Sequence, residues 1–340
     1  MKKLISPFSV LLPLLLLQLN LFAQEDNDKG EKVEKRYEFT KTKSVNKSYT
    51  VSSSDKLSVD NEFGKVEVHT WDRNEIKVDV NIEVSATKED LAQKIIDGIA
   101  VKDAQSGRDI SFKTSIKGTN NKESNNDSKN EKSTMHVNYS ISMPASNPLH
   151  IENSFGSTTL PDYRGEVELS SKFGSLTAGA LSNIKSINVE FGKANFQGLT
   201  NGTVTVKYSK AEFTKLSGNV KLNLEFCSTT KINIDNSLTG LDVKASYSSV
   251  NIRPTGDLSA SYNIATSFGD LKNHTSVKFD GDNEDDNRGP KFDHKYSGKS
   301  GSGSIPVKVS TSFGRVILGE PGPDDIKKDK EKNKSKSRTS

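Results

Sequence analysis

The chain has 340 residues, of which 32% are hydrophobic and 7% aromatic, and its formal net charge is only +4. So low a hydrophobic content is typical of thin β-structure with a large exposed surface, and it argues against a thick globular core. Basic residues gather in the last part of the chain, so a general nucleic-acid-binding surface is not expected. A single cysteine, Cys227, excludes an intramolecular disulfide, and the apolar residues before it predict a buried thiol.

The first 23 residues have the features of a cleaved export signal. Two lysines precede an apolar stretch that ends at the small residue Ala23. A retained membrane anchor is the alternative, because the stretch approaches the length of a membrane span, but prolines and polar residues inside it weaken that interpretation. We therefore expect an exported protein, periplasmic, on the outer-membrane surface or secreted, with no transmembrane span after cleavage.

Residues 24–49 are expected to form a partly disordered lead-in to an N-terminal β unit over residues 50–148. Within this unit, residues 57–68 form a small copy of the repeat described below. Alternating apolar residues then predict a strand over 76–84.

One helix is predicted in this unit, over residues 88–98. Thr87 is placed to cap it, acidic residues occupy its first turn, and apolar residues follow at four-residue spacing. We expect this helix to cover the open N-terminal end of a stack of strands, because uncovered strand edges pair with other molecules. A polar, disordered loop is predicted over 118–132.

An aromatic residue followed by a small residue recurs through residues 149–319. Successive aromatics from Phe155 to Phe268 lie 17 to 21 residues apart, and the last copy follows 45 residues later, after a polar insertion at 280–303. A regular period of this kind is typical of stacked repeats. The copies, including one upstream, are Phe63-Gly64, Phe155-Gly156, Phe173-Gly174, Phe191-Gly192, Tyr208-Ser209, Phe226-Cys227, Tyr247-Ser248, Phe268-Gly269 and Phe313-Gly314.

The residues around each aromatic predict two short strands per unit. Apolar residues alternate before the aromatic, as Val204 and Val206 do before Tyr208, and the next apolar positions come three and five residues after it. Because three is odd, the chain must turn at this step, where glycine accepts a positive φ and a close backbone approach. The alternation places the aromatics inside, stacked in a ladder, so Phe173→Ala and Phe191→Ala are predicted to leave core cavities.

The predicted fold class is therefore all-β: a β-solenoid or β-helix-like stack of two-strand repeats with one short N-terminal capping helix. Hairpin signals such as Asn201-Gly202 leave an antiparallel meander or sandwich as the alternative. One unit departs from the pattern, since Ile232 and Ile234 come one residue late after Phe226, which predicts a one-residue insertion.

No catalytic, cofactor or metal site stands out. The five histidines are scattered, and no glycine of the repeat belongs to a phosphate-binding loop. The acidic run 280–286 could bind calcium, but it lacks the spacing of an EF-hand, and a solvated loop is the simpler interpretation. The charged tail, residues 320–340, is predicted to be disordered.

The unit at residues 57–68, the turn at Trp71-Asp72, the strand over 76–84, the helix and the recurring Ser-Phe-Gly units resemble the family of exported bacterial β-strand-repeat proteins called putative adhesins, related to the head-GIN group and common in Bacteroidetes-like bacteria. The resemblance covers about residues 50–320. It implies a right-handed β-helix-like fold and an adhesin-like role in the cell envelope, and it brings no active site with it.

Three functions are compatible with these features. The first is a non-catalytic envelope or surface protein that binds or scaffolds an envelope protein or glycan, with self-association through strand edges as a related outcome. The second is a polysaccharide-active β-helix enzyme, for which Asp162, Arg164, Glu166 and Glu168 are the nearest approach to a charged cluster. The third is an envelope-stress sensor whose tail or loops contact a membrane-bound regulator.

Overall fold

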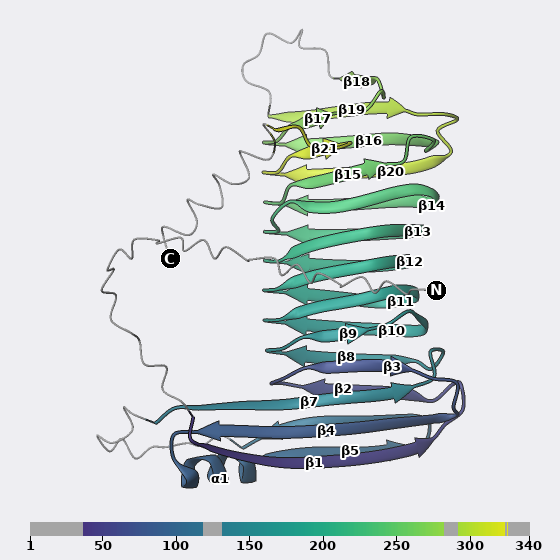
Figure 1. The fold of residues 1–340 in the computed structure, drawn as a ribbon. Coiled ribbons are helices and arrows are strands. Elements are labelled where there is room, and N and C mark those ends of the chain that lie inside the picture. Colours follow the sequence, from purple (N-terminus) through teal and green to yellow (C-terminus); the bar gives the residue numbers. More distant parts are fainter. Residues whose placement is uncertain (1–36, 118–130, 282–291, 324, 326–340) are drawn as a thin grey trace, which may run out of the picture. The chain divides into compact units, whose positions relative to one another are not determined.

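The structure is a computed structural model that describes residues 37–117, 131–281, 292–323 and 325. The predicted export signal, most of the lead-in, the core of the 118–132 loop and nearly all of the charged tail lie outside these residues. Within them the chain is mostly β-structure with one helix, as predicted (Figure 1). No helix in the described part is long and apolar enough to span a membrane.

The N-terminal unit contains seven strands and the helix, in this order along the chain: β1 (Phe39–Thr50), β2 (Lys56–Asn61), β3 (Val66–Thr70), β4 (Glu75–Ala86), α1 (Glu89–Gly98), β5 (Ile99–Ser106), β6 (Asp109–Ile116) and β7 (Ser133–Met143).

The repeat region continues with β8 (Leu149–Ser154), β9 (Thr158–Leu160), β10 (Tyr163–Lys172), β11 (Ser175–Glu190), β12 (Lys193–Lys207), β13 (Lys210–Glu225), β14 (Thr230–Ser246), β15 (Val250–Pro254), β16 (Ala260–Ser267), β17 (Leu271–Asn273), β18 (Phe279–Gly281), β19 (Asp293–Lys299), β20 (Ile305–Ser312) and β21 (Val316–Leu318).

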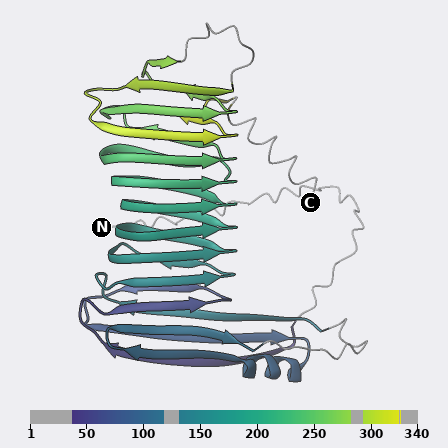
Figure 2. The same ribbon diagram turned by 180° about the vertical axis from the view of Figure 1, so that it is seen from behind.

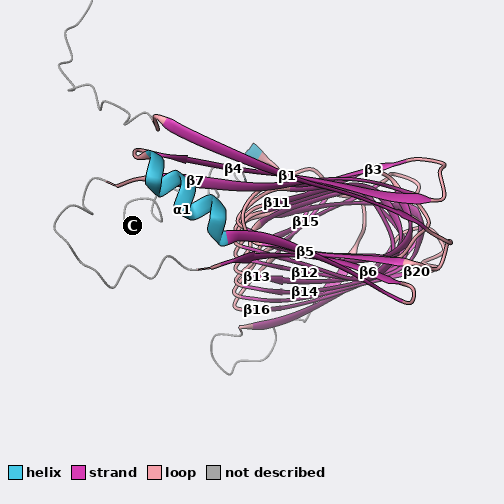
Figure 3. Cartoon of the chain, turned by 90° about the horizontal axis from the view of Figure 1, so that it is seen from below, coloured by secondary structure: helices cyan, strands magenta, loops and turns pink. Residues whose placement is uncertain are grey.

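Successive repeats pair in parallel and in register, each residue beside its counterpart one repeat away. Ala194 on β12 pairs with Ala211 on β13, and Val206 pairs with Leu224. A long strand such as β11 serves both faces of the stack: its first half pairs with β9 and its second half with β10. The two opposing faces are visible in the view along the stack (Figure 3). Parallel pairing excludes the antiparallel meander between these units.

The core between the two faces is made by the alternating residues that the sequence predicted. Val204, Val206 and Leu222 are fully buried, and Leu224 is nearly so. The late repeat follows the predicted insertion, because Ile232 pairs with Phe213 and lies inside.

The order of the last repeats differs from their order in the sequence. β20 pairs with β14 on one side and with β16 on the other, and β21 lies likewise between β15 and β17. The last repeat of the chain is therefore inserted inside the stack, and the repeat that precedes it in the sequence is displaced outward (Figures 1 and 2).

Antiparallel strands close the stack at both of its ends. At the N-terminal end β1 pairs with β4, and β4 with β7. At the other end β19 pairs with β16 and with β18, which corrects the prediction that residues 280–303 are only an exposed loop. The part of this insertion that includes most of the acidic run lies outside the described residues, so calcium binding there stays a prediction.

The predicted helix is present as α1, with Ala92, Ile95 and Ile96 buried against the N-terminal strands. Thr87 does not cap it. The N-cap residue is Lys88, and the Thr87 hydroxyl instead accepts a hydrogen bond from the Lys132 backbone at 3.2 Å. A threonine hydroxyl can hydrogen-bond to any nearby backbone group, so a threonine next to a strand can bond to that strand in place of capping the helix.

Candidate functional site

The aromatic residues of the repeat lie on the outside of the stack, and the prediction that they are core residues is wrong. From Phe155 to Phe313 their exposed fractions lie between 40% and 53%. The reason is the backbone. Each of these residues has φ between 49° and 57°, the left-handed conformation, which ends the strand and redirects the side chain away from the side that the alternation predicts.

At most repeats, glycine serves only one of the two purposes predicted for it, the close backbone approach and not the positive φ. Only Gly64 among the glycines of the repeat has a positive φ. At Gly174 and Gly192, a Cβ atom would lie 1.8 Å and 1.6 Å from the carbonyl oxygen of the glycine one repeat below. Glycine is therefore required because neighbouring backbones approach closely, which was the second half of the prediction.

Three repeats carry serine or cysteine at the glycine position, and their side chains bond to the backbone. The Ser209 hydroxyl accepts a hydrogen bond from the Gly192 N–H at 2.9 Å and donates to the Lys207 carbonyl at 2.6 Å. Ser248 accepts from the Cys227 N–H in the same way. Cys227 is buried, as predicted, and burial raises the pKa of its thiol.

The exposed rings stack on one another in a continuous ladder. Neighbouring ring centroids are 4.7–5.1 Å apart, and the ring planes are within 9° of parallel except at the last pair, where the angle is 21°. We call this row the aromatic ridge. In spatial order it contains Phe63, Phe155, Phe173, Phe191, Tyr208, Phe226, Tyr247, Phe313, Phe268 and Phe292.

Stacking offsets the strain of the turns. A non-glycine residue in the left-handed conformation costs roughly 1–2 kcal/mol, and each aromatic pair returns about 0.5–1.5 kcal/mol beyond its buried area. Because each ring lies between two others, the ring faces are covered and the ring edges point to solvent. The ridge thus presents a narrow apolar edge on the order of 40 Å long, given nine strand spacings of about 4.8 Å.

Charged residues flank the middle of the aromatic ridge. The residues directly before four successive rings alternate in sign: Lys172, Glu190, Lys207 and Glu225. Lys207 and Glu225 form an ion pair at 3.0 Å, and this carboxylate raises the pKa of the Lys207 amine.

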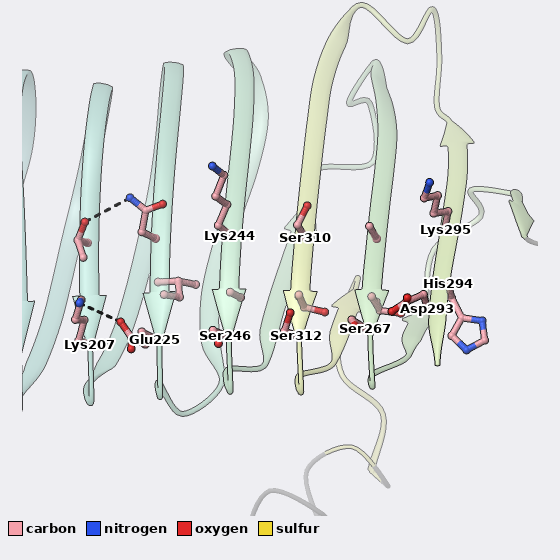
Figure 4. A pocket seen from close by; sticks show the side chains of 17 residues that line it. Lys207, Glu225, Lys244, Ser246, Ser267, Asp293, His294, Lys295, Ser310 and Ser312 are labelled. Atoms are coloured by element: carbon pink, nitrogen blue, oxygen red, sulfur yellow. Dashed lines mark hydrogen bonds and ion pairs between the residues drawn. The ribbon is translucent and has the colours of Figure 1, made fainter. Parts of the chain in front are cut away.

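A groove lies beside the far part of the aromatic ridge, on the outer face formed by β12, β13, β14, β20, β16 and β19 (Figure 4). Its volume is about 560 Å³, within the range of small-molecule binding sites. Lysines and acids lie around a floor of short side chains, among them Ser246, Ser312 and Ser267. None of these groove residues was singled out by the sequence. One signal in the sequence could have indicated the groove. The residue directly before the ring is lysine or glutamate in the middle repeats and changes to serine before the last rings.

Of the four residues considered for an enzyme, Asp162 and Glu168 are held by hydrogen bonds, and Arg164 and Glu166 are exposed on β10. The Asp162 carboxylate accepts a hydrogen bond from the Ala180 N–H on β11 at 2.7 Å and so links two neighbouring repeats. Lys185 donates to Glu168 at 3.0 Å, and this hydrogen bond holds the pKa of Glu168 below its usual range. Glu168 is therefore ionised and paired, which does not suit a general acid. Within the described ranges, no group of three or more His, Cys, Asp and Glu side chains could hold a metal ion.

A second polar cluster anchors the end of the described chain. Asp325 is buried, and its carboxylate lies 2.8 Å from the His274 ring and 3.8 Å from the Arg315 guanidinium. Arg315 also donates to Asp270 at 2.8 Å. These contacts attach Asp325, at the start of the tail, to the stack.

No protein-family model matches the chain, and no curated protein matches it. Solved structures with a similar chain path include a "putative adhesin" from Bacteroides fragilis, with 12% identity, a TM-score of 0.34, and coverage of 81% of this chain and 97% of that one. Another is a "putative cell adhesion protein" from Clostridium sporogenes, with 13% identity, a TM-score of 0.24, and coverage of 83% and 100%. A third, from Parabacteroides distasonis, is described as a "putative lipid binding protein", with 10% identity, a TM-score of 0.28, and coverage of 82% and 97%. At these values the likeness carries no argument about activity.

Proposed function

We propose that this protein is an exported, non-catalytic binding protein of the bacterial envelope or surface, adhesin-like in role, whose aromatic ridge is its contact surface. The scaffold that we propose is a β-solenoid, an interpretation supported by the parallel, in-register pairing of residues one repeat apart. Its relation to the adhesin-like families of exported β-repeat proteins is part of the same proposal.

The observation that carries the proposal is the exposure of the ring edges. Large apolar side chains are usually buried, and a contiguous exposed row of them marks a surface that meets a partner. The core does not need these rings, because it is filled by a separate set of alternating residues. A rigid row of edges in fixed register also loses little conformational entropy on binding.

The test removes rings while keeping the backbone turn. Asparagine tolerates the left-handed conformation better than other non-glycine residues. We therefore expect Phe173→Asn, Phe191→Asn and Tyr208→Asn together to abolish retention of the mature protein on bacterial cells and isolated envelope material, while circular dichroism stays unchanged. The matched control changes three exposed residues elsewhere on the same repeats, Thr177, Asn195 and Gln197, to alanine. Full retention by the asparagine variant would disprove the role of the aromatic ridge.

Two other proposals predict different results. A polysaccharide-active enzyme would release soluble sugars from envelope glycans, with turnover lost in Asp162→Asn or Glu166→Gln. A stress sensor would lose signalling, with intact folding and adhesion, when residues 326–340 are deleted.

A further inference from the structure

The groove beside the aromatic ridge is built from two rows of side chains that cross the strands. In the first row, Ser246, Ser312 and Ser267 lie side by side on β14, β20 and β16. The register continues to Glu225 on β13 and to Asp293 on β19, so an acid stands at each end. The hollow arises because short side chains lie between long ones.

The second row has the opposite charge at its ends. Lys244 on β14 is in register with Ser310 on β20, which is followed by Ala265 on β16 and Lys295 on β19. Both lysines are exposed, and the two residues between them are short. Each end of the groove thus combines an ammonium donor with a carboxylate acceptor, and the floor supplies hydroxyl groups (Figure 4).

This arrangement narrows the chemistry of the ligand. The lining contains three lysines and two acids, and one lysine, Lys207, is already paired with Glu225. With His294 neutral the groove therefore has a net charge of only +1, from which a strongly anionic ligand gains little. An extended peptide binds sheets through a free strand edge, whereas this floor is the face of paired strands. Donors, acceptors and hydroxyl groups in alternation suit a ligand that is itself covered with hydroxyl groups.

The direction of the groove matches a chain rather than a single small molecule. The three floor serines repeat at the strand spacing of about 4.8 Å, which is comparable to the length of one sugar ring. Each serine directly precedes a ring of the aromatic ridge, namely Tyr247, Phe313 or Phe268. None of these rings is among the residues that line the groove, so the groove and the aromatic ridge are neighbouring but separate surfaces.

We propose that this groove binds an uncharged glycan chain, laid along the stack with about one sugar per strand. The proposal rests on the binding role proposed above and names its ligand class. Serine hydroxyls on the floor and the lysine and acid pairs at the ends hydrogen-bond to sugar hydroxyls.

The experiment is calorimetric titration of the mature protein with uncharged tetrasaccharides of glucose, xylose, mannose and N-acetylglucosamine, and with tetragalacturonate as the acidic comparison. We expect at least one uncharged tetrasaccharide to bind, with Kd on the order of 0.1 mM. Ser312→Gln fills the floor and is expected to weaken this binding by about tenfold or more. The matched control is Ser154→Gln, which adds the same side chain directly before Phe155, outside the groove, and is expected to bind normally.

The outcomes separate this inference from the proposed function. No binding of any uncharged tetrasaccharide at millimolar concentration, tighter binding of tetragalacturonate, or equal binding by Ser312→Gln would each overturn the inference. If the unmodified protein still adheres to cells and the asparagine ridge variant does not, the proposed function survives that result. If the asparagine ridge variant binds tetrasaccharides normally and also adheres to cells normally, the glycan-binding inference survives and the proposed role of the aromatic ridge fails.

Discussion

Two stacked sets of aromatic rings in this molecule behave in opposite ways. Phe196 and Phe213 stack at 5.5 Å between neighbouring repeats and are fully buried inside. Phe191 and Tyr208, on the same two repeats, stack at 4.8 Å and are about half exposed. Both pairs recur at the repeat spacing, so the period alone does not tell core from surface. The difference is the backbone, extended at the first pair and left-handed at the second.

The largest expected loss of stability comes from changing the buried ring pair. Phe213→Ala should destabilise the protein by about 3–5 kcal/mol, because it leaves a cavity that the paired strands cannot collapse into. Phe191→Ala should cost less, about 1–3 kcal/mol, because a half-exposed ring loses mainly its two stacking contacts, each of about 0.5–1.5 kcal/mol. Chemical denaturation of both variants measures the two free energies of unfolding. Equal losses would mean that the ridge is part of the core after all.

The next effect concerns the glycine beside the ridge. In Gly192→Ala the added methyl group would overlap the Gly174 carbonyl, so two paired strands must separate locally. We expect a loss of about 2–4 kcal/mol, typical of overpacked backbone contacts. Gly256→Ala is the control, since nothing lies within 4 Å of a Cβ at that turn. If the two variants lower the denaturation midpoint by the same amount, the close approach of neighbouring backbones at Gly192 is contradicted.

The smallest expected effect concerns the reactivity of the Cys227 thiol, which directly follows a ring of the ridge and is buried. Burial raises the pKa of the Cys227 thiol, so the thiol stays protonated at pH values where a free cysteine reacts. The raised pKa stabilises the fold below the ordinary thiol pKa, and this contribution is lost as the pH rises through the folded-state value. We expect slow labelling by a thiol reagent at pH 8 in the native protein and fast labelling in denaturant. Rapid native labelling would show that the turn opens readily.

The sequence predicted much of the fold because its signals are local. Strand alternation placed residues such as Val204 and Leu222 in the core correctly, and the late apolar positions after Phe226 revealed the irregular repeat. The candidate site was missed for the opposite reason. Its groove is made by residues far apart in sequence, such as Glu225, Lys244 and Asp293, which come together only through the pairing of strands.

The repeat period, the strands, the alternating aliphatic core residues and the glycine positions follow from the sequence by itself, since alternation and small residues act within a few positions of the chain. Tertiary structure alone decided two features. The aromatic residues turn outward because stacking with the rings of neighbouring repeats offsets an unfavourable left-handed backbone, which no single repeat would adopt by preference. The last repeat enters the stack out of order because β20 finds partners on both β14 and β16, and such long-range pairing leaves no mark in the local pattern.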